Sequence, residues 1–372
     1  MCTYVPRRSN NSRKVVNRMP EKVLMKGNEA LAEAAIQAGC RHFFGYPITP
    51  QTELAAYMSK RMPKIGGTYL QAESEVAAVN MVLGAASAGV RAMTSSSSPG
   101  VSLKTEGISY MAGSDLPALI INVQRGGPGL GGIQPSQADY WQATKATGHG
   151  DFQILVFAPS TVQEMVDLVS DAFDKADQYR MPAMILADGM LGQMMEPVQL
   201  RDNNDRTLPE KPWAASGHQN KREHNIINSL YLTPQELERL VKERFARYQI
   251  IKDKEQRAEE YLVDDADIVI VAYGASSRVS RSAVNTAREQ GIKVGLIRPI
   301  TLWPFPTKAI SKAAETAKDF LCVEMSMGQM VDDVRLTVNG KVPVHFYGRT
   351  GGMIPTPAEV LGQIQTIAGG QK

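Results

Sequence analysis

The amino-acid sequence predicts an α/β protein built from two doubly wound domains, each a parallel sheet with helices on both faces. Short, continuously apolar runs alternate with amphipathic helical segments over residues 25–197, and the same alternation returns after residue 265. Strands that are apolar on both sides are typical of a parallel sheet whose two faces are covered. A chain of 372 residues is also long for a single core, so about two domains are expected.

The first domain is expected over residues 25–197. Its helices are indicated by apolar residues that recur with helical spacing, and its strands by short apolar runs between Gly, Pro and polar residues. Helices are predicted at 28–38, 51–61, 75–88, 101–111 and 162–179. Strands are predicted at 42–44, 67–71, 91–94, 118–123, 154–158 and 183–187. Because strands and helices alternate, the strands are expected to run parallel.

The second domain is expected over residues 265–372 and is the smaller of the two. Strands are predicted at 268–274, 293–300, 320–325 and 342–348. Helices are predicted at 276–290, 307–317, 329–338 and 357–367. The stretch AYGASSRVSRSA, which follows the first of these strands, has a single glycine. This argues against the glycine-rich loop of a dinucleotide-binding fold.

Two segments differ in composition from these domains. Residues 1–24 are basic and lack apolar periodicity, and we expect a disordered extension there. Residues 198–264 carry many charges of both signs, and we interpret them as a linker that runs over the surface. One solvated helix is predicted within this linker at 234–251, where Glu238 and Lys242 have the helpful i, i+4 spacing.

Charge and cysteine usage exclude several classes of function. The formal net charge of +3 gives no reason to expect nucleic-acid binding. The three cysteines, Cys2, Cys40 and Cys322, are scattered singly, which argues against an iron–sulfur or structural zinc site within this chain. No apolar run approaches the ~20 residues that cross a membrane. We expect no membrane partner, no metal-binding residues and a cytoplasmic location.

Polar loops follow several predicted strands of the first domain, and the carboxyl ends of parallel strands meet at one sheet edge, where α/β proteins bind ligands. In GYPITP at 45–50, two prolines stiffen the turn, and Thr49 offers a hydroxyl beside the free amides of the next helix. In QAESEVAA, Ser74 is a capping residue type and Glu75 lies in the first helical turn. Taken singly, these features also fit a rigid turn and a first-turn carboxylate that stabilises its helix.

Two further loops follow strands at the same predicted edge. In NVQRGGPGLGG, Arg125 comes directly after an apolar strand, and the glycines beside it allow a ligand to approach the backbone. A guanidinium is suited to a bidentate grip on a carboxylate or phosphate. The loop lacks the Gly-Lys-Ser/Thr ending of a P-loop, and alone it also fits a flexible surface loop. The stretch TSSSSPG at 94–100 offers hydroxyls, and it is also a plausible polar entry to a helix.

The stretches GYPITPQTE, QAESEVAAV, TSSSSPG and NVQRGGPGLGG occur in the order and with the spacing of the alpha-type subunit of 2-oxoacid:ferredoxin oxidoreductases. The chain resembles this family from residue 25 onward. Its C-terminal stretch YGRTGGMIPTPAEV is most similar to the branched-chain, 2-oxoisovalerate type. The resemblance implies that the first domain is the pyrimidine-binding half of a thiamine diphosphate site and that the second is a transketolase C-terminal-like domain.

The resemblance also implies roles for individual residues. Glu75 falls where the family's glutamate bonds the aminopyrimidine ring nitrogen, and Arg125 falls where an arginine holds the substrate carboxylate. Thr49 falls where a threonine faces both cofactor and substrate. Glu73 is the acidic alternative to Glu75, although two residues along a helix it would point elsewhere. The cofactor site is expected to be lined by Tyr46, Pro47, Ile48, Thr49, Glu75 and Ser98.

The family reaction needs groups that this chain lacks. The diphosphate and Mg²⁺ of the cofactor are held by a Gly-Asp-Gly turn and a later pair of asparagines. Here ADGM at 187–190 and the pair at 203–204 imitate that pattern, but the first Gly is Ala and the spacing is too short. The resemblance therefore implies a beta-type partner that brings the diphosphate half and Mg²⁺. It also implies gamma-type and ferredoxin-like delta subunits with iron–sulfur clusters, coenzyme A as cosubstrate and ferredoxin as acceptor.

The expected reaction is the oxidative decarboxylation of a 2-oxo acid, most plausibly 2-oxoisovalerate, to an acyl-CoA. The same reaction on 2-oxoglutarate is an alternative, which a further cation in the pocket would favour. A second alternative is a nucleotide-binding module with a Rossmann-like fold and no chemistry of its own. His149, in ATGHGDF, is a candidate base, although a lone loop histidine is more often structural.

Overall fold

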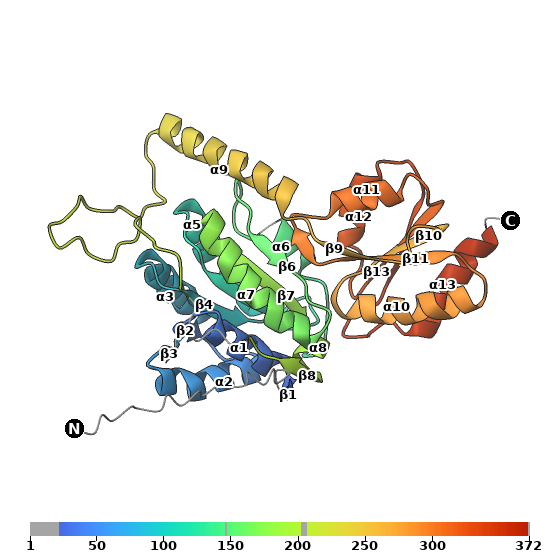
Figure 1. Ribbon diagram of the computed structural model, residues 1–372, viewed down its shortest axis with the longest axis horizontal. Helices are drawn as coiled ribbons and strands as arrows, with labels where there is room; N and C mark the ends of the chain where they lie inside the picture. The colour runs from blue at the N-terminus through green and yellow to red at the C-terminus, as the bar shows by residue number, and fades with distance from the viewer. Residues whose placement is uncertain (1–21, 146, 202–206, 371–372) are drawn as a thin grey trace, which may run out of the picture.

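The computed structural model describes residues 22–145, 147–201 and 207–370, and within them it contains two mainly parallel sheets, as the sequence predicts (Figure 1). The first sheet has seven strands in the order β12-β6-β7-β5-β4-β2-β3. The parallel strands of this sheet are β2 (His42–Gly45), β3 (Thr68–Gln71), β4 (Ala92–Ser96), β5 (Leu119–Gln124), β6 (Leu155–Phe157) and β7 (Ala183–Asp188).

Helices cover both faces of the first sheet. On one face, α1 (Gly27–Gln37) packs against α2 (Thr52–Arg61) and α7 (Val162–Tyr179). On the other face, α3 (Glu75–Ser87) packs against α5 (Thr105–Gly113). This division follows from right-handed crossovers between the parallel strands. A 3-10 turn and three short helices complete the domain: η1 (Met62–Ile65), α4 (Ser98–Ser102), α6 (Tyr140–Thr144) and α8 (Gly189–Gln193).

The second sheet has five strands in the order β14-β13-β10-β11-β9. Its parallel strands are β10 (Ile268–Val271), β11 (Val294–Pro299), β13 (Asp319–Glu324) and β14 (Val344–Gly348). Helices α10 (Gly274–Glu289) and α13 (Pro357–Gly370) pack together on one face of this sheet. Helices α11 (Thr307–Ala313) and α12 (Met330–Val338) pack together on the other face. The α/β class with two doubly wound units is confirmed.

Two short strands differ from the expected division of the chain. Strand β12 (Thr301–Trp303) leaves the second unit and pairs antiparallel with β6, so it forms an edge of the first sheet. Strand β9 (Ala258–Tyr261) lies in the expected linker, yet it pairs antiparallel with β11 in the second sheet. Both strands are too short for a clear alternation of polar and apolar residues. Their partners, which lie far away in the sequence, determine their conformation.

The expectations for the two charged segments also need correction. Strand β1 (Lys22–Lys26) pairs with β8 (Met195–Gln199), so residues 22–24 of the expected extension belong to the fold, whereas residues 1–21 lie outside the described residues. The linker helix α9 (Pro234–Lys254) is not fully solvated. Its Arg244 is buried and bonds Asp115 at 3.1 Å, because one side of the helix packs on the first unit.

One helix boundary is wrong in an informative way. The predicted helix at 101–111 is divided into α4 and α5, with the break at residues 103–104. Helix α4 begins three residues earlier than expected because Pro99 occupies its first turn, where a missing N–H is no loss. TSSSSPG therefore combines the end of strand β4 with a polar helix entry.

The two sheets share one hydrophobic core. A single contiguous cluster of buried apolar residues runs from Met25 to Val338 and includes residues of both units. A smaller cluster lies between the second sheet and the helices α10 and α13. The first unit therefore does not have a core of its own, as two independent domains would have.

Polar contacts reinforce this junction. The buried Gln137 donates from its amide side chain to the Tyr273 carbonyl oxygen at 2.8 Å, and its side-chain oxygen accepts from Ser276 at 2.7 Å. Its backbone N–H donates to the carbonyl oxygen of Met325 at 2.9 Å. The Tyr140 hydroxyl donates to Asp333 at 2.5 Å. These bonds fix the second unit at the carboxyl edge of the first sheet.

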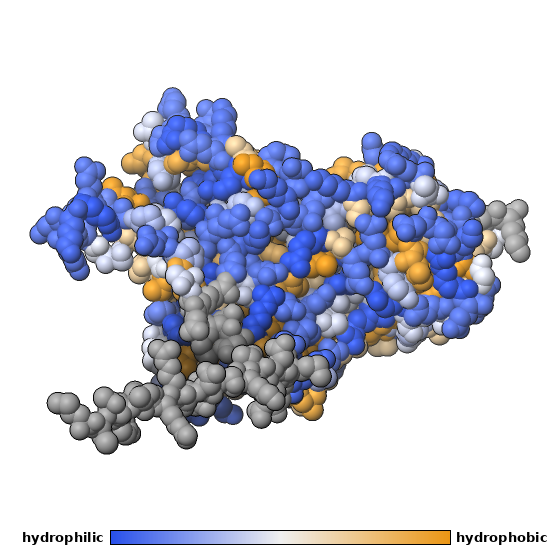
Figure 2. Space-filling view, in the orientation of Figure 1, coloured by the Kyte–Doolittle hydropathy of each residue, from blue (hydrophilic) through white to orange (hydrophobic). Residues whose placement is uncertain are grey.

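The surface drawn in Figure 2 is largely hydrophilic, with hydrophobic side chains scattered among polar ones. Within the described ranges, no helix combines the length and the apolar character that a membrane span requires.

Arg91 is the most heavily engaged buried cation of the first unit. Its guanidinium pairs with Asp174 at 2.7 Å and with Asp177 at 2.8 Å, and it donates to the Ala38 carbonyl oxygen at 2.5 Å. It also lies 5.3 Å from the ring centroid of Phe173. These contacts join α7 to the turns before β2 and β4.

Replacing this cation is expected to destabilise the fold. Arg91→Met will lower the free energy of unfolding by about 3 kcal/mol, because Asp177 is left buried with Lys211 as its remaining ion-pair partner among the described residues. Chemical denaturation measures this difference. Arg239→Met, which removes exposed ion pairs of α9, is the control and should leave the free energy of unfolding nearly unchanged. Equal losses in the two variants would contradict the role assigned to Arg91.

Candidate functional site

The polar loops predicted to share one edge do so. The loops at 46–50, 72–75, 97–100 and 125–134 follow β2, β3, β4 and β5, four neighbouring parallel strands, at the carboxyl edge of the first sheet. The turn after β4 links the group, since its Ser98 contacts Arg125 and its Gly100 contacts Glu75. Within the described residues, no hydrogen bond joins Glu75 directly to Thr49 or Arg125.

Arg125 is buried and holds two loops together. One nitrogen of its guanidinium, Nη1, donates to the Thr49 carbonyl oxygen at 2.9 Å, and Nη2 donates to the Leu130 carbonyl oxygen at 3.0 Å. The buried Nε has no hydrogen-bond partner among the described residues. A guanidinium carries five N–H donors, so donors remain for a ligand anion. The glycines beside Arg125 suggest an open loop, but its guanidinium is buried against two backbone carbonyl oxygens.

Ser98 fixes the backbone at Arg125. Its hydroxyl accepts from the Arg125 N–H at 3.0 Å and donates to Asp139 Oδ2 at 2.6 Å. Asn122 also donates to Asp139, at 2.9 Å. Burial raises the pKa of Asp139, and the bonds from Ser98 and Asn122 lower it. Ser98 is thus committed to the protein, and its place in the site is to position the start of the glycine-rich loop.

Gln51 fixes the turn at 46–50 through hydrogen bonds. This buried side chain accepts from Ser95 Oγ at 2.6 Å, and its amide donates to the Tyr46 carbonyl oxygen at 3.4 Å. The backbone N–H of Gln51 donates to the Ile48 carbonyl oxygen at 3.2 Å. Thr49 and Pro47 are exposed on the edge. The turn therefore presents the Thr49 hydroxyl outward, at the end of a fixed loop.

Glu75 begins helix α3 and is buried, whereas Glu73 is exposed. Ser74 caps this helix, as predicted: its hydroxyl accepts from the Ala77 N–H at 3.2 Å. The Glu75 side chain accepts no hydrogen bond within the described chain, and its carboxylate oxygens are not among the enclosed atoms that lack a partner. The carboxylate is therefore open to a ligand at this edge.

The backbone of Gly100 packs closely against this carboxylate. A Cβ atom at Gly100 would lie 2.7 Å from Glu75 Oε1 and 2.2 Å from Ser96 Oγ, which is closer than such atoms approach. The Ser96 hydroxyl is itself buried without a hydrogen-bond partner among the described residues. Position 100 therefore has to be glycine if Glu75 and Ser96 keep these orientations.

Lys104 is the charged residue associated with Glu75. Its side chain is fully buried, and Nζ has no hydrogen-bond partner among the described residues. Burial lowers the pKa of Lys104 to about 8, and the charge of Glu75 opposes that shift. Sequence reasoning missed Lys104. The available signal was helical spacing, which places Lys104 on the same face as Val101, Ile108 and Met111 in VSLKTEGISYM.

The second unit adds a loop to this edge. A Cβ atom at Gly352, in the stretch RTGGM, would lie only 2.3 Å from the Gln134 Cβ of the glycine-rich loop. Gly131 adopts a φ of +60°, and its neighbour Gly132 donates to the Gly126 carbonyl oxygen at 2.9 Å. Exposed apolar side chains surround the contact, with Leu130 85% and Met353 55% exposed. An edge rimmed in this way is typical of a protein interface.

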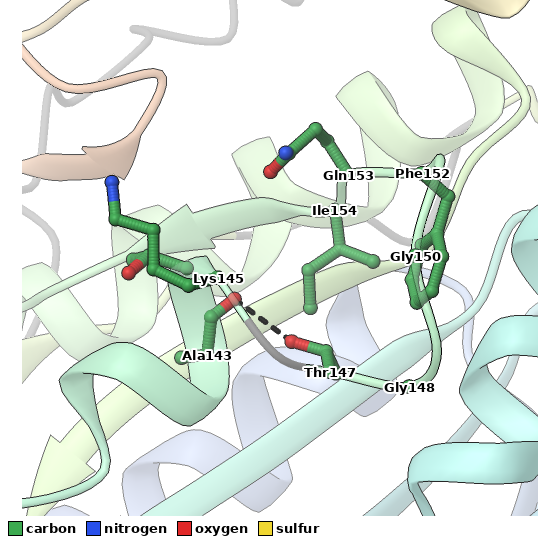
Figure 3. Close-up of a pocket in the computed structure, with 9 residues that line it drawn as sticks. Ala143, Lys145, Thr147, Gly148, Gly150, Phe152, Gln153 and Ile154 are labelled. Atoms are coloured by element: carbon green, nitrogen blue, oxygen red, sulfur yellow. Dashed lines mark hydrogen bonds between the residues drawn. The ribbon is translucent and has the colours of Figure 1, made fainter.

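His149 lies apart from these residues. Its Nδ1 is 3.5 Å from Ser109 Oγ, and it lines a cavity with Asp151, Phe152 and Arg244. Figure 3 shows the smaller pocket beside it, where the Thr147 hydroxyl donates to the Ala143 carbonyl oxygen at 3.0 Å. Neither space is lined by a residue predicted to bind cofactor or substrate.

The motif ADGM has a structural role. Asp188 Oδ1 accepts from the N–H groups of Met190 and Leu191, both at 3.0 Å, and Oδ2 accepts from the Ala275 N–H at 3.2 Å. Burial raises the pKa of Asp188 to about 6, against these bonds. The carboxylate thus caps α8 and meets the start of α10. Asn203 and Asn204 lie outside the described residues, and the described part contains no group of three or more His, Cys, Asp or Glu suited to a metal.

Family models cover both units. Residues 33–261 match the family described as pyruvate flavodoxin/ferredoxin oxidoreductase, thiamine diphosphate-binding. Residues 266–360 match the pyruvate:ferredoxin oxidoreductase core domain II.

Curated relatives are similar over nearly their whole length. The ketoisovalerate oxidoreductase subunit VorB of Methanothermobacter marburgensis is 49% identical over 346 residues, which is 93% of this chain and 98% of that protein. The 2-oxoglutarate synthase subunit KorA of the same organism is 37% identical over 378 residues, 93% of this chain and 99% of that one.

Solved structures share the fold. A 2-oxoglutarate:ferredoxin oxidoreductase from Magnetococcus marinus, determined with 2-oxoglutarate, coenzyme A and succinyl-CoA, superposes with a TM-score of 0.85 at 28% identity. The match covers 93% of this chain and 65% of that one. A split-gene transketolase superposes with a TM-score of 0.57 at 13% identity, over 92% of this chain and 97% of its own, which is a likeness of fold alone. With these matches the resemblance is confirmed: the chain belongs to the alpha-type subunits of the 2-oxoacid:ferredoxin oxidoreductases, a family whose first domain binds thiamine diphosphate.

Proposed function

We propose that this chain is the alpha subunit of an enzyme that converts 2-oxoisovalerate to an acyl-CoA by oxidative decarboxylation and reduces ferredoxin. The Glu75 carboxylate carries the proposal, because it lies at the carboxyl edge of the sheet without a hydrogen bond from the described residues and so offers an acceptor to a ligand there. The substrate is favoured by the relatives: the subunit named for ketoisovalerate is 49% identical, and the subunit named for 2-oxoglutarate is 37% identical. A non-catalytic nucleotide-binding module is not proposed, since the matched family consists of thiamine diphosphate-binding oxidoreductases.

The residues at the edge fit an aminopyrimidine ring. Glu75 offers the acceptor that a ring N–H requires, and the close approach of the Gly100 backbone limits the positions open to its carboxylate. When bound, thiamine diphosphate supplies the nucleophilic carbon that attacks the 2-oxo group and the ring system that holds the electrons as carbon dioxide leaves. Glu75 accepts the hydrogen bond of the protonated ring nitrogen, and the proton moves between the carboxylate and that nitrogen. A positioned carboxylate in such a role contributes ~10²- to 10⁴-fold to the rate.

Arg125 and Thr49 orient the substrate in this proposal. The unused N–H donors of the Arg125 guanidinium bind the substrate carboxylate, while its bonds to Thr49 and Leu130 keep it in place. The exposed Thr49 hydroxyl faces the same side. Arg349, the cation on the adjoining loop of the second unit, is paired with Glu359. Of these two arginines, Arg125 is thus the one with N–H donors free for a substrate, which suits a substrate with one carboxylate.

The remaining groups are assigned to partner subunits. We propose that a beta-type subunit docks on the apolar rim around Leu130 and Met353 and brings Mg²⁺ and the diphosphate-binding half of the site. Iron–sulfur clusters are placed on partners of the beta, gamma and ferredoxin-like delta types, with coenzyme A as cosubstrate. Cys40 and Cys322 are buried and separate, and burial raises the pKa of the Cys40 thiol to about 12, which disfavours a thiolate ligand. Free thiols fit a reducing, cytoplasmic location.

A substrate comparison tests the proposed function. The complex, purified with the subunits that accompany this chain, is expected to reduce a viologen dye with a kcat/KM for 2-oxoisovalerate at least about tenfold above that for 2-oxoglutarate, because one cation receives the substrate. Omitting coenzyme A from the assay is the control. A preference for 2-oxoglutarate would overturn the substrate assignment, and no turnover of any 2-oxo acid would overturn the function.

Removing the Glu75 charge is expected to stop turnover. Glu75→Gln keeps the size of the side chain but removes its basicity, and kcat should fall at least about 10²-fold with subunit assembly preserved. Viologen reduction by the complete complex measures this. The matched control is Glu73→Gln, the same change on the exposed neighbour, which should keep near-normal activity. Similar effects at the two positions would remove Glu75 from the site.

Replacing Arg125 by lysine is expected to raise the KM for the 2-oxo acid more than it lowers kcat. In Arg125→Lys, one charge remains but the bidentate donor geometry is lost, so KM should rise about 10- to 100-fold. Steady-state kinetics on 2-oxoisovalerate give the split between KM and kcat. Arg41→Lys, on a residue that bonds only backbone carbonyls away from this edge, serves as the control. An unchanged KM would show that another group binds the substrate carboxylate.

A further inference from the structure

A buried lysine beside Glu75 has no part in the function derived above. Lys104 lies at the junction of α4 and α5, and its side chain is completely enclosed. Its Nζ makes no hydrogen bond within the described chain. An ammonium taken out of water without a partner is costly, and an apolar side chain of similar size would fill the same space without that cost. The presence of a lysine at this buried position is therefore best explained by its charge.

Glu75 is the charged group that acts on Lys104. Among the neighbouring elements, α3 contributes Glu75 as its one titratable residue, and α4, β4 and β5 contribute none. Helix α5 contributes Glu106 and Tyr110, which bond one another on the surface. Gly100, four residues before Lys104, packs against the Glu75 side chain, and Gly107, three residues after it, packs against Val79 of α3, so Lys104 lies between two contacts with the helix that begins at Glu75. The charge of Glu75 acts on Lys104, although no hydrogen bond joins the two side chains among the described residues.

We propose that Lys104 is a positioning residue of the thiamine diphosphate site, whose ammonium balances the Glu75 carboxylate and holds it oriented for the aminopyrimidine ring. This inference rests on the proposed function, because it needs Glu75 to meet that ring. Lys104 touches neither cofactor nor substrate and acts through Glu75. With the ammonium of Lys104 present, the pair is neutral overall, and the Glu75 carboxylate does not need a second cation as a partner.

The pair has a defined pH dependence. Burial lowers the pKa of Lys104 to about 8, so the side chain carries its charge at neutral pH. As the pH rises through this value, the lysine loses its proton and Glu75 loses its counter-charge. Cofactor affinity and kcat should both fall on this alkaline side.

The experiment uses the complete complex after removal of its cofactor. Thiamine diphosphate affinity is measured by calorimetry in the presence of Mg²⁺, and kcat is measured with 2-oxoisovalerate, both between pH 6.5 and about 9 to cover the titration of Lys104. Lys104→Met removes the charge at similar volume, and Lys104→Arg keeps the charge at every pH tested. Lys242→Met, on the exposed side of α9, is the control for loss of a lysine.

The expected outcomes are distinct for each variant. In Lys104→Met, cofactor affinity at pH 7 should fall about tenfold or more, and the alkaline fall should disappear. Lys104→Arg should bind normally at pH 7 and also lack the alkaline fall, whereas Lys242→Met should match the wild type. An alkaline fall retained in Lys104→Met, or in Lys104→Arg if the Met variant does not assemble, would overturn the inference. So would its absence from the wild type.

Glu75→Gln, measured in parallel, distinguishes failure of the role of Lys104 from failure of the proposed function. If it abolishes turnover while Lys104→Met behaves as wild type, only the role of Lys104 is refuted. If Glu75→Gln also leaves turnover and cofactor affinity intact, the proposed function of this edge is refuted as well.

Discussion

The structure depends on one constraint, the placement of the Glu75 carboxylate at the edge of a parallel sheet. The described residues supply no hydrogen bond to this carboxylate, so its acceptor oxygens are available at the edge. Ser74 caps the helix that carries Glu75, the backbone of Gly100 packs closely against it, and its charge acts on the buried Lys104. Arg125 and Ser98 then fix the neighbouring loops. In the proposed function, these features serve a ligand that binds at this edge.

Much of the fold follows from local pattern, and the exceptions have a common cause. The helix predicted at 162–179 matches α7 residue for residue, because its apolar stripe is long and regular. Strands β9 and β12 escaped prediction since they are short and depend on partners far away in the chain. The same holds at the site: Glu75, Thr49 and Arg125 stand in recognisable motifs, whereas Gln51, Asp139 and Lys104 gain their meaning from contacts across the fold. Local sequence does not encode such contacts.

The second unit is part of the site's frame. Gln137 bonds Tyr273, Ser276 and Met325, and the core continues from one sheet to the other, so the two units form one packed body. The loop around Gly352 lies on the glycine-rich loop next to Arg125. Substitutions in the second unit are therefore able to shift the glycine-rich loop without touching a ligand. The family's two domains are better regarded here as one scaffold with a shared edge.

The position of β12 has a consequence for how the chain is made. Strand β6 at 155–157 pairs on its outer side with residues 301–303, which the ribosome adds long after the rest of the first sheet. Until those residues emerge, the nascent first unit carries an open strand edge of the kind that pairs with other chains. The first sheet is therefore complete only when residue 303 has been made, so the two units finish folding together.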